Sequence, residues 1–547
     1  EFYSAVCTRL PVVAAFRLDA VGRRMWYLAV AAALACAHAS ARLLWFVVYA
    51  AVLVTGLQAY NRYRLRGWPS PGFPKTLPIL GNVVSAGPAF MRYLGREAKQ
   101  HGGLFLFWPG GSAPIAVVAS PRGAREVLGN GVLFPKGADY EEKFGVVFGK
   151  GLVTSTGADH SAARRCLGRY FVKTNLEQHG DVMRQECEKM ADEVFEPKLA
   201  NADADGFVEM DLQEFFHLCT LQIFCRVQLS IDMMEFGTAK GHPAPPVSAA
   251  KSNARGDWAH WIAMSMSWGS NVIGEHMLYN IPLLRCVPRV PRLLATKKQL
   301  DAAAFLPMIE ERRKLVAHGN APEDCLTALI TADAPAFSDQ AICDQLTTLI
   351  AAGHDTTAYF CCYAAMLLAK EPKWQDTVRN ELARPAFDWP ASALKRVVQE
   401  TLRLYPVIPM VIRVAAQDAV ISNTDETKLA VPRGTRLLVP FFCLNRLPET
   451  WGPNAAKFDP DRWLEAEGAP RSDGVMRAPA GFLPFGYGSR TCIGYALALL
   501  ELKVIFAVLL RRYEFAPVPG FSPTILAGIS LTVENPKGIK IRVKRRA

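Results

Sequence analysis

The sequence predicts a mainly α-helical fold, and three segments support this prediction. Residues 43–60 are uncharged and apolar, and they are long enough to span ~30 Å of hydrocarbon as a helix. Residues 338–370 form a longer, largely apolar run with helix signals at both ends. Glu400 and Arg403 are three residues apart, a spacing that places both side chains on one face of a third helix.

The composition indicates a globular protein. Half of the 547 residues are hydrophobic, which is enough for a large core. This length suggests roughly three domains of ~150 residues, although a large helical enzyme can be a single domain. The formal net charge of +12 suits nucleic acid, an anionic membrane surface or an acidic protein. The sequence contains no nucleic-acid-binding motif, so we expect a membrane or protein partner and no nucleic acid.

The N-terminal part is expected to hold a membrane anchor. Residues 25–41 are also apolar, but Arg42 separates them from residues 43–60, so we expect one tilted or partly interfacial helix rather than two full spans. One alternative is a buried helix of a globular core. A cleaved signal peptide is a second alternative, but the apolar region starts late and is long for such a peptide.

We divide the chain into three parts. Residues 1–66 form the anchor with its basic flank. Residues 67–82 are punctuated by proline and glycine, and they form an extended hinge that cannot be helical. Residues 83–547 form the main domain. Arginines stand on both sides of the apolar region, so the charge rule for membrane orientation is nearly balanced.

A polar notch interrupts the helix predicted for residues 338–370. Ser338 is the candidate N-cap, and Pro372 follows the last turn. In the middle of this apolar helix, Gly353 is followed by the polar residues 354–357, and glycine is a poor helix former. Such a local departure tends to mark a functional site. The alternative is a glycine packed against another helix, with the polar side chains facing water.

Cys492 is the second unusual feature, in the stretch FLPFGYGSRTCIG of residues 482–494. A zinc or iron–sulfur site needs several closely spaced cysteines, and the odd total of 13 cysteines is typical of a reduced intracellular protein. Two roles remain, a reactive nucleophile and a thiolate ligand whose metal is otherwise held by a cofactor. No histidine lies nearby to activate a nucleophile, whereas haem iron needs only one thiolate. Arg490 would then pair with a propionate, and Gly488 would leave space for the macrocycle.

The same stretch resembles the cysteine loop of the cytochrome P450 superfamily, FxxGxRxCxG. Phe485, Gly488, Arg490, Cys492 and Gly494 match this pattern without gaps. The resemblance implies a mainly α fold with a smaller β part, preceded by the N-terminal anchor helix. It also implies haem b (iron protoporphyrin IX), bound through an axial thiolate from Cys492. It extends from the hinge to about Arg542 and is specific from Ser338 onward.

Residues 352–357, AGHDTT, resemble the distal helix of the same family. In that family the helix crosses over the haem, the glycine leaves room for dioxygen, and the acid and threonine organise water for proton delivery. The resemblance therefore implies these roles for Gly353, Asp355 and Thr356, and we take Asp355 and Thr356 as the catalytic residues.

The segment QETLRLYP supplies Glu400 and Arg403. An isolated pair of this kind is usually a solvated surface contact worth under ~1 kcal/mol. In the family, however, the ExxR pair is buried and locks with an arginine of a later loop. Arg462 in FDPDRW is the candidate for that third member, and the three residues would stabilise the core around the haem pocket.

Further candidate haem contacts come from single positions. Arg413 fits a family position that reaches a haem propionate. The segment GADHSAARR places His160 where the family commonly has tryptophan, followed by Arg164. The alternative is an amphipathic surface helix, which explains Arg165 and Arg169 equally well.

We therefore expect a haem-thiolate monooxygenase that inserts one oxygen atom of O2 into a C–H bond of a lipophilic substrate, such as a fatty acid, sterol or terpenoid. No flavin domain follows Arg542, so electrons are expected from a separate NADPH-cytochrome P450 reductase, with cytochrome b5 as a further donor. The proline-rich hinge resembles that of family members anchored in the endoplasmic reticulum membrane, which places the catalytic domain in the cytosol.

Two other functions stay open. A reductase-independent peroxide isomerase or dehydratase of the same fold would not need the polar notch. A membrane haem sensor or electron-transfer protein would have no substrate. Six apolar residues are the candidates for the substrate pocket: Phe144, Val147, Ile350, Ala351, Val407 and Ile408.

Overall fold

The structure is a computed structural model of the 547-residue chain. It describes residues 48, 52, 54–70, 81–82, 89–109, 113–237, 256–277, 289–332, 336–383, 393–465, 479–521 and 538–546. The chain divides into two compact units, and everything from Arg64 onward except residues 111–113 belongs to the second. All of the candidate site residues lie in this second unit.

The first unit contains the segment in which the anchor is expected. Residues 54–63 are helical here, while most of residues 43–53 lies outside the described residues. Within the described part of the chain, no helix is both long and apolar enough to cross a membrane. The second unit starts before the predicted hinge, because Leu65 and Trp68 are buried in its core. The indole Nε1 of Trp68 donates to the carbonyl oxygen of Ala430 at 2.8 Å.

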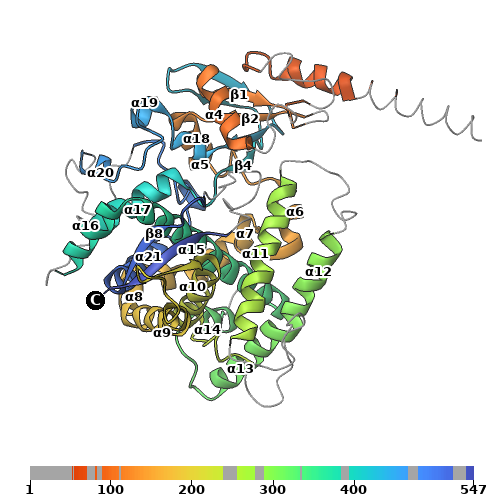
Figure 1. The fold of residues 1–547 in the computed structure, drawn as a ribbon. Helices are drawn as coiled ribbons and strands as arrows, with labels where there is room; N and C mark the ends of the chain where they lie inside the picture. The colour runs from red at the N-terminus through yellow and green to blue at the C-terminus, as the bar shows by residue number, and fades with distance from the viewer. Residues whose placement is uncertain are drawn as a thin grey trace, which may run out of the picture. The chain divides into compact units, whose positions relative to one another are not determined.

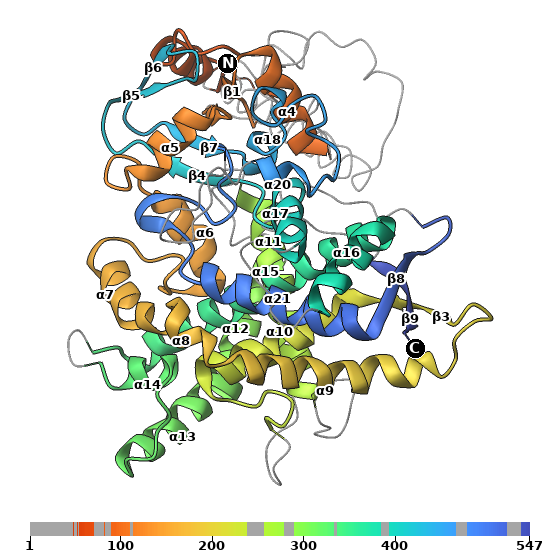
Figure 2. The same ribbon diagram turned by 90° about the vertical axis from the view of Figure 1, so that its left-hand side faces the viewer.

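Helices make up most of the second unit (Figures 1 and 2). The helices of its first half are α4 (Phe90–Gln100), α5 (Pro121–Gly129), α6 (Ala138–Phe148), α7 (Gly157–Gly168), α8 (Lys173–Glu177), α9 (Gly180–Leu199), α10 (Leu212–Leu229) and α11 (Asp257–Met277). Those of its second half are α12 (Arg289–Leu300), α13 (Leu306–Ala317), α14 (Cys325–Ile330), α15 (Asp339–Lys370), α16 (Pro372–Leu382), α17 (Ala393–Leu404), α18 (Phe441–Leu444), α19 (Pro448–Trp451), α20 (Arg462–Glu465) and α21 (Tyr495–Arg512).

Three small sheets complete the unit. The four-stranded sheet has the order β1 (Leu104–Phe107), β2 (Ile115–Val118), β7 (Arg436–Val439), β4 (Val411–Val414), in which only β2 and β7 are parallel. The antiparallel three-stranded sheet has the order β3 (Phe207–Asp211), β9 (Lys540–Arg545), β8 (Tyr513–Pro517), and the antiparallel hairpin is β5 (Ala419–Ser422) with β6 (Lys428–Val431). The four-stranded sheet lies at one end of the unit with α4, α5 and α18, and α9, α13 and α14 lie at the other end. The predicted mainly α fold with a smaller β part is thus confirmed.

Helix α15 forms the centre of the unit and presents the predicted notch. It begins after Ser338, whose hydroxyl accepts from the N–H of Ala341 at 3.2 Å, the capping geometry that its sequence predicts. It ends before Pro372, which starts α16. Most of its side chains are buried, and α10 packs along it. Buried residues on both sides of α15 belong to one continuous hydrophobic core.

Candidate active site

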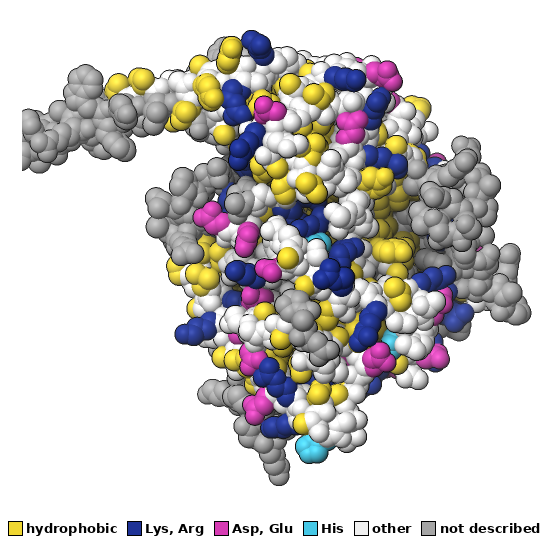
Figure 3. Space-filling view, turned by 180° about the vertical axis from the view of Figure 1, so that it is seen from behind, with side chains coloured by type: hydrophobic (Ala, Val, Ile, Leu, Met, Phe, Trp, Pro, Cys, Tyr) yellow, Lys and Arg dark blue, Asp and Glu magenta, His cyan; other side chains and the backbone are white. Residues whose placement is uncertain are grey.

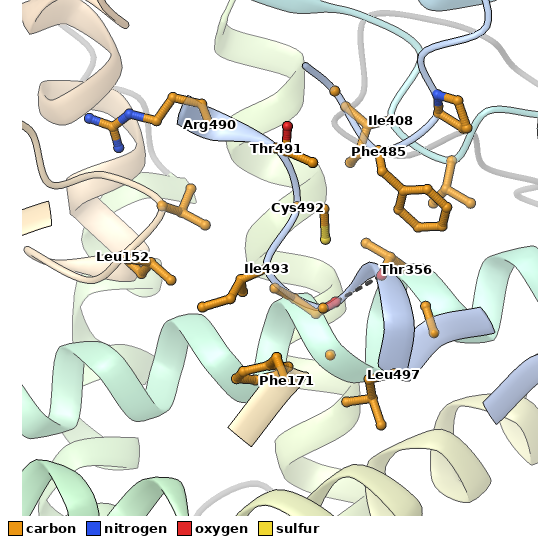
Figure 4. A pocket seen from close by; sticks show the side chains of 18 of the residues that line it. Leu152, Phe171, Thr356, Ile408, Phe485, Arg490, Thr491, Cys492, Ile493 and Leu497 are labelled. Carbon is orange, nitrogen blue, oxygen red and sulfur yellow. Dashed lines mark hydrogen bonds between the residues drawn. The ribbon is translucent and has the colours of Figure 1, made fainter. Parts of the chain in front are cut away.

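A cavity lies between α15 and the loop that leads into α21 (Figure 4). It brings together residues that are far apart in the sequence. The predicted site residues that line it are His160, Arg164, Gly353, Thr356, Arg413, Phe485, Arg490, Cys492 and Gly494. Asp355, Gly488, Glu400, Arg403 and Arg462 do not line it.

Cys492 presents its sulfur to this cavity from the loop before α21 (Figure 4). The backbone N–H of Cys492 donates to the carbonyl oxygen of Phe485 at 2.8 Å, which closes the loop. The exposed surface of the side chain faces the cavity. Burial among protein atoms raises the pKa of the thiol, and the N–H of Gly494 and the charge of Arg164 oppose this effect. Among the residues that the structure describes, no cluster of His, Cys, Asp and Glu side chains could hold a metal, so the sulfur faces the cavity without a protein ligand set.

Four cations surround one side of the cavity: Lys136, Arg164, Arg413 and Arg490. Lys136 donates to the carbonyl oxygen of Val153, and Arg490 donates to that of Ser155 at 3.0 Å. Within the described parts of the chain, none of the four forms an ion pair with a carboxylate. Burial, followed by the charges of Arg490, Arg413 and Arg164, holds the pKa of Lys136 well below its ordinary value.

The same positive field acts on Arg490 and His160. Burial and then the charges of Arg413 and Arg164 lower the pKa of Arg490 to about 10. Burial, followed by the charges of Arg490, Lys136 and Arg164, lowers the pKa of His160 to about 4. His160 is therefore neutral near pH 7, and it lines the cavity as a hydrogen-bonding group rather than as a further cation.

These observations fit a haem. A flat apolar group with two carboxylates would meet the apolar wall of the cavity and bring two negative charges to the four cations, which the described residues pair with no carboxylate. A metal at its centre would stabilise the thiolate form of Cys492, because a coordinating thiol is deprotonated. Arg164, Arg413 and Arg490 would hold the carboxylates as predicted. Lys136 joins them, although no local motif marks it in the sequence.

Comparison with known proteins agrees with this interpretation. The cytochrome P450 family model matches residues 71–543. The chain belongs to the cytochrome P450 family. It is 26% identical to the probable cytochrome P450 4s3 of Drosophila melanogaster over 92% of this chain and 97% of that protein. It is 27% identical to cytochrome P450 734A1 of Arabidopsis thaliana over 82% of both chains. It is 32% identical to cytochrome P450 714D1 of Oryza sativa subsp. japonica over 49% of both chains.

The notch of α15 faces Cys492 across the cavity of this cytochrome P450. The Thr356 hydroxyl donates to the carbonyl oxygen of Ala352 at 2.8 Å (Figure 4). Thr357 donates in the same way to Gly353 at 3.2 Å. A Cβ atom on Gly353 would lie 2.2 Å from the ring of Phe224, so the glycine here also makes room for α10. Thr356 and Gly353 thus line the cavity as expected.

Asp355 lies on another side of α15. Its carboxylate is buried against α10, 3.2 Å from Nε2 of His217, and it does not line the cavity. Adjacent residues of a helix point about 100° apart, so Thr356 can face the cavity while Asp355 faces α10. The expected role of Asp355 in proton delivery therefore requires a path around the helix.

Gly488 and Gly494 of the cysteine loop lie in different surroundings. Gly488 has a φ of +73°, and a Cβ atom there would lie 2.5 Å from the carbonyl oxygen of Leu128 in α5. Its lack of a side chain allows this close packing against α5, and Gly488 does not line the cavity. Its predicted role in leaving space for the macrocycle stays a prediction. Gly494 lines the cavity beside Cys492.

The Glu400 and Arg403 pair is fully buried. Arg403 donates to both oxygens of Glu400 at 2.7 and 2.8 Å, and both side chains have 0% exposed surface. Arg462 donates to Glu400 at 3.0 Å, which is the third contact that the resemblance implied. The indole of Trp463 also donates to Glu400 at 3.0 Å. The alternative of a solvated surface pair does not hold for these residues.

One wall of the cavity is held by backbone groups. Gly149 has a φ of +51°, and a Cβ atom there would overlap the carboxylate of Asp344. The carboxylate of Asp344 accepts from the N–H of Lys150 at 2.8 Å. At the next residue of α15, the side-chain oxygen of Gln345 accepts from the N–H of Leu152 at 3.0 Å. Leu152 lines the cavity, so α15 fixes this wall without using the Leu152 side chain.

Two of the six predicted apolar pocket residues line the cavity, Val407 and Ile408. The other four are buried outside its wall: Phe144, Val147, Ile350 and Ala351. Further apolar residues of the wall come from α10, α15 and α21: Phe224, Leu349, Phe360 and Leu497. Position along a helix decided this outcome, because Ile350 and Ala351 point away from the face that carries Ala352 and Thr356.

Proposed function

We propose that this cytochrome P450 inserts one oxygen atom of O2 into a C–H bond of a lipophilic substrate, such as a fatty acid, sterol or terpenoid, at a haem b held by Cys492. The single observation that carries the proposal is the cavity itself. It has a free thiol on one side, the Thr356 hydroxyl across from it, and a largely apolar wall. An apolar wall recognises a substrate by excluding water from it.

The haem, when bound, supplies the activation of O2 and the oxygen transfer. The chain supplies the rest. Cys492 binds the metal, and Arg164, Arg413, Arg490 and Lys136 pair with the carboxylates. The Thr356 hydroxyl can both donate and accept a hydrogen bond, so it can hold water or pass a proton at its Oγ1 atom. Val407, Ile408 and other apolar side chains hold the substrate close to the reacting centre.

The proposed electron source is a separate membrane-bound NADPH-cytochrome P450 reductase, with cytochrome b5 as a further donor. The net charge of +12 supports an acidic partner. Lysines and arginines are spread over the face in Figure 3, and some of them lie within a hollow near its middle. Arg165 and Arg169 of the α7 region are exposed. Exchanging both for glutamate should slow reduction, with a smaller difference at high ionic strength; equal stopped-flow rates at all salt concentrations would contradict docking at these residues.

The substrate is tested by titration of lipids, sterols and terpenoids, following the shift of the Soret band. A binder should then give an oxygenated product that depends on NADPH, reductase and O2. Turnover of a hydroperoxide without reductase would instead support the isomerase or dehydratase function. Haem binding with no substrate-dependent NADPH use would support a sensor.

We place the enzyme in the endoplasmic reticulum membrane, with the catalytic unit in the cytosol. The apolar run of residues 43–60 and the resemblance of the hinge support this location. Deletion of residues 1–63 should release most of the protein from the membrane fraction with its haem bound. Deletion of residues 1–66 is the matched comparison, because it also removes the buried Leu65 and should lower stability. An aggregated, haem-free product from the shorter deletion would contradict the division.

A further inference from the structure

The partner of Asp355 is a buried histidine of α10. His217 has 0% and Asp355 3% exposed side-chain surface. Nε2 of His217 lies 3.2 Å from Oδ1 of Asp355. The two residues are 138 positions apart in the chain, and they meet where α10 packs along α15. Within the described residues, His217 is the side chain with which the structure pairs Asp355.

The hydrogen bonds of His217 define where its protons lie. Nδ1 is 2.7 Å from the carbonyl oxygen of Gln213, and a carbonyl oxygen can only accept. Nδ1 therefore carries a hydrogen. Nε2 then faces Asp355 in one of two ways, as an N–H that donates to the carboxylate or as a lone pair that accepts from a carboxyl O–H. In both cases this buried contact contains one proton beyond the Nδ1 hydrogen.

The surroundings keep this proton between the two residues. The ring of His354 lies 5.9 Å from that of His217, and burial lowers the pKa of His354, so His354 does not compete for the proton at neutral pH. Tyr359 meets the His217 ring edge-on at 5.0 Å. The Tyr359 hydroxyl lies 3.3 Å from that of Ser267 in α11. Glu214 of α10 and His260 of α11 pair with each other at 3.3 Å, and both side chains are more than half exposed.

Helix α10 also touches the notch at a second point. The Thr220 hydroxyl donates to the carbonyl oxygen of His354 at 3.0 Å. Thr220 is three residues after His217, so both side chains lie on the face of α10 that meets α15. Besides the ring of Phe224 against Gly353, α10 thus contacts the notch through two polar groups, of which only His217 is titratable. This difference allows proton supply to be separated from helix packing.

We propose that His217 is a positioning residue that holds and replaces the proton that Asp355 supplies to the notch. The proposal rests on the proposed roles of Asp355 and Thr356. In the supply step, the O–H bond of the protonated Asp355 breaks and its proton passes through water to the Thr356 side of the helix. The carboxylate left behind faces Nε2 of His217, and the pair takes up one proton from solvent to restore the starting state. One proton leaves and one enters, and no electrons are transferred.

Two substitutions of His217 test this proposal. His217→Gln keeps a side-chain N–H for Asp355 but cannot pass on a proton, and His217→Phe removes the contact. Thr220→Val is the matched control, because it removes the other polar contact of α10 with the notch without removing a titratable group. Haem content and the carbonyl spectrum of the reduced protein show which variants are correctly assembled.

The first readout does not depend on activity. We would label histidine with ¹⁵N and record NMR spectra of the haem-loaded, reduced carbonyl form. The ¹⁵N chemical shift of Nε2 in His217 should be that of a nitrogen sharing a proton with a carboxylate. That shift should change in Asp355→Asn and persist in Thr220→Val. A His217 spectrum of an ordinary neutral imidazole, unaffected by Asp355→Asn, would overturn the proposal even where His217→Gln fails to fold.

The second readout is oxygen consumption in H2O and D2O with a competent reductase. His217→Gln should slow consumption at least about tenfold, as Asp355→Asn does, with a larger solvent isotope effect. The double variant should be no slower than either single variant, because both act on one proton. A parent-like rate in His217→Gln with a slow Asp355→Asn would overturn the role of His217. A parent-like rate in Asp355→Asn would instead overturn the proposed role of Asp355 itself.

Discussion

Two groups of buried charge in this enzyme are built in opposite ways. Around α17, the carboxylate of Glu400 accepts from Arg403, Arg462, Trp463 and the backbone N–H of Asp459. The other N–H groups of Arg403 donate to backbone carbonyl oxygens, including that of Asn445 at 2.8 Å. Every charge in this network is neutralised within the chain. At the cavity, in contrast, Lys136, Arg164, Arg413 and Arg490 lie together and the structure pairs none of them with a carboxylate.

The difference separates a structural group from a binding group. A buried charge without a partner destabilises a fold by several kcal/mol, so a cluster of four cations is retained only when something else neutralises it. Burial, and then the charges of the neighbouring cations, lower the pKa of Lys136 and of Arg490. The network around Glu400, Arg403 and Arg462, here called the closed network, should therefore stabilise the fold. The four cations at the cavity, here called the open cluster, should mainly bind the cofactor.

The largest effect should come from Cys492, because it is the ligand around which the open cluster is arranged. Cys492→Ala should abolish the carbonyl band that is characteristic of thiolate-ligated haem and abolish monooxygenase activity, since a methyl group cannot bind iron. Difference spectra of the reduced carbonyl complex measure this directly. Cys443→Ala, a buried cysteine outside the cavity, is the control and should keep the band. A normal band in Cys492→Ala would refute the assignment.

The closed network should give the next largest effect. Arg403→Ala leaves Glu400 buried and unpaired, which costs roughly 3 to 5 kcal/mol of stability. The yield of folded, haem-loaded protein and its urea midpoint should fall together. Arg313→Ala is the matched control, because Arg313 and Asp339 form an ion pair that is about half exposed and should cost under about 1 kcal/mol. Equal losses in the two variants would contradict the closed network.

In the open cluster, a substitution should weaken haem binding and leave global stability almost unchanged. Lys136→Gln removes one of four mutually repelling cations, so global stability should change little or rise. Haem should dissociate faster, by a factor of ten to a hundred for a charged contact of about 1.5 to 3 kcal/mol. Transfer of haem to apomyoglobin measures the dissociation rate. If Lys136→Gln lowers the urea midpoint as Arg403→Ala does, Lys136 belongs to the scaffold instead.

The smallest effect concerns pH. An unfolded chain protonates His160 below about pH 6.5, whereas the folded protein prepared without haem protonates it only near pH 4. Because the folded-state pKa is lowered, the folded protein binds fewer protons, and stability falls by about 1 to 3 kcal/mol as the pH decreases from 6.5 to 4. His160→Gln should flatten this decrease in urea titrations, and the exposed His318→Gln should not. An unchanged slope in His160→Gln would contradict the buried, neutral state.

Local signals in the sequence predicted the scaffold well. The cap of α15 at Ser338 could be predicted because capping depends on residues that are close in the sequence. The pairing of Glu400 with Arg403 could be predicted because residues three apart share one face of a helix. Arg462 could be placed because the resemblance to the family covers its segment. These features either are local or carry a recognisable motif.

The remaining parts of the site depend on contacts between distant segments. Lys136 lies in the loop before α6 and has no motif, so only the fold shows that it joins Arg413 and Arg490. The direction of Asp355 could not be read from the pattern that contains it. Asp355 points toward His217 of α10. Which face of α15 meets α10 depends on how the two helices pack, and the sequence pattern alone does not show this packing.

The backbone-held wall at Gly149 has a consequence for how this enzyme can change. Asp344 and Gln345 fix the chain through the N–H groups of Lys150 and Leu152, which every residue except proline possesses. The side chain at position 152 is thus decoupled from the support of the loop. Mutation there can reshape the cavity while the loop keeps its path, so this position is a natural starting point for directed evolution of new substrate ranges. Gly149, whose missing side chain makes room for Asp344, is the residue that such a library should leave unaltered.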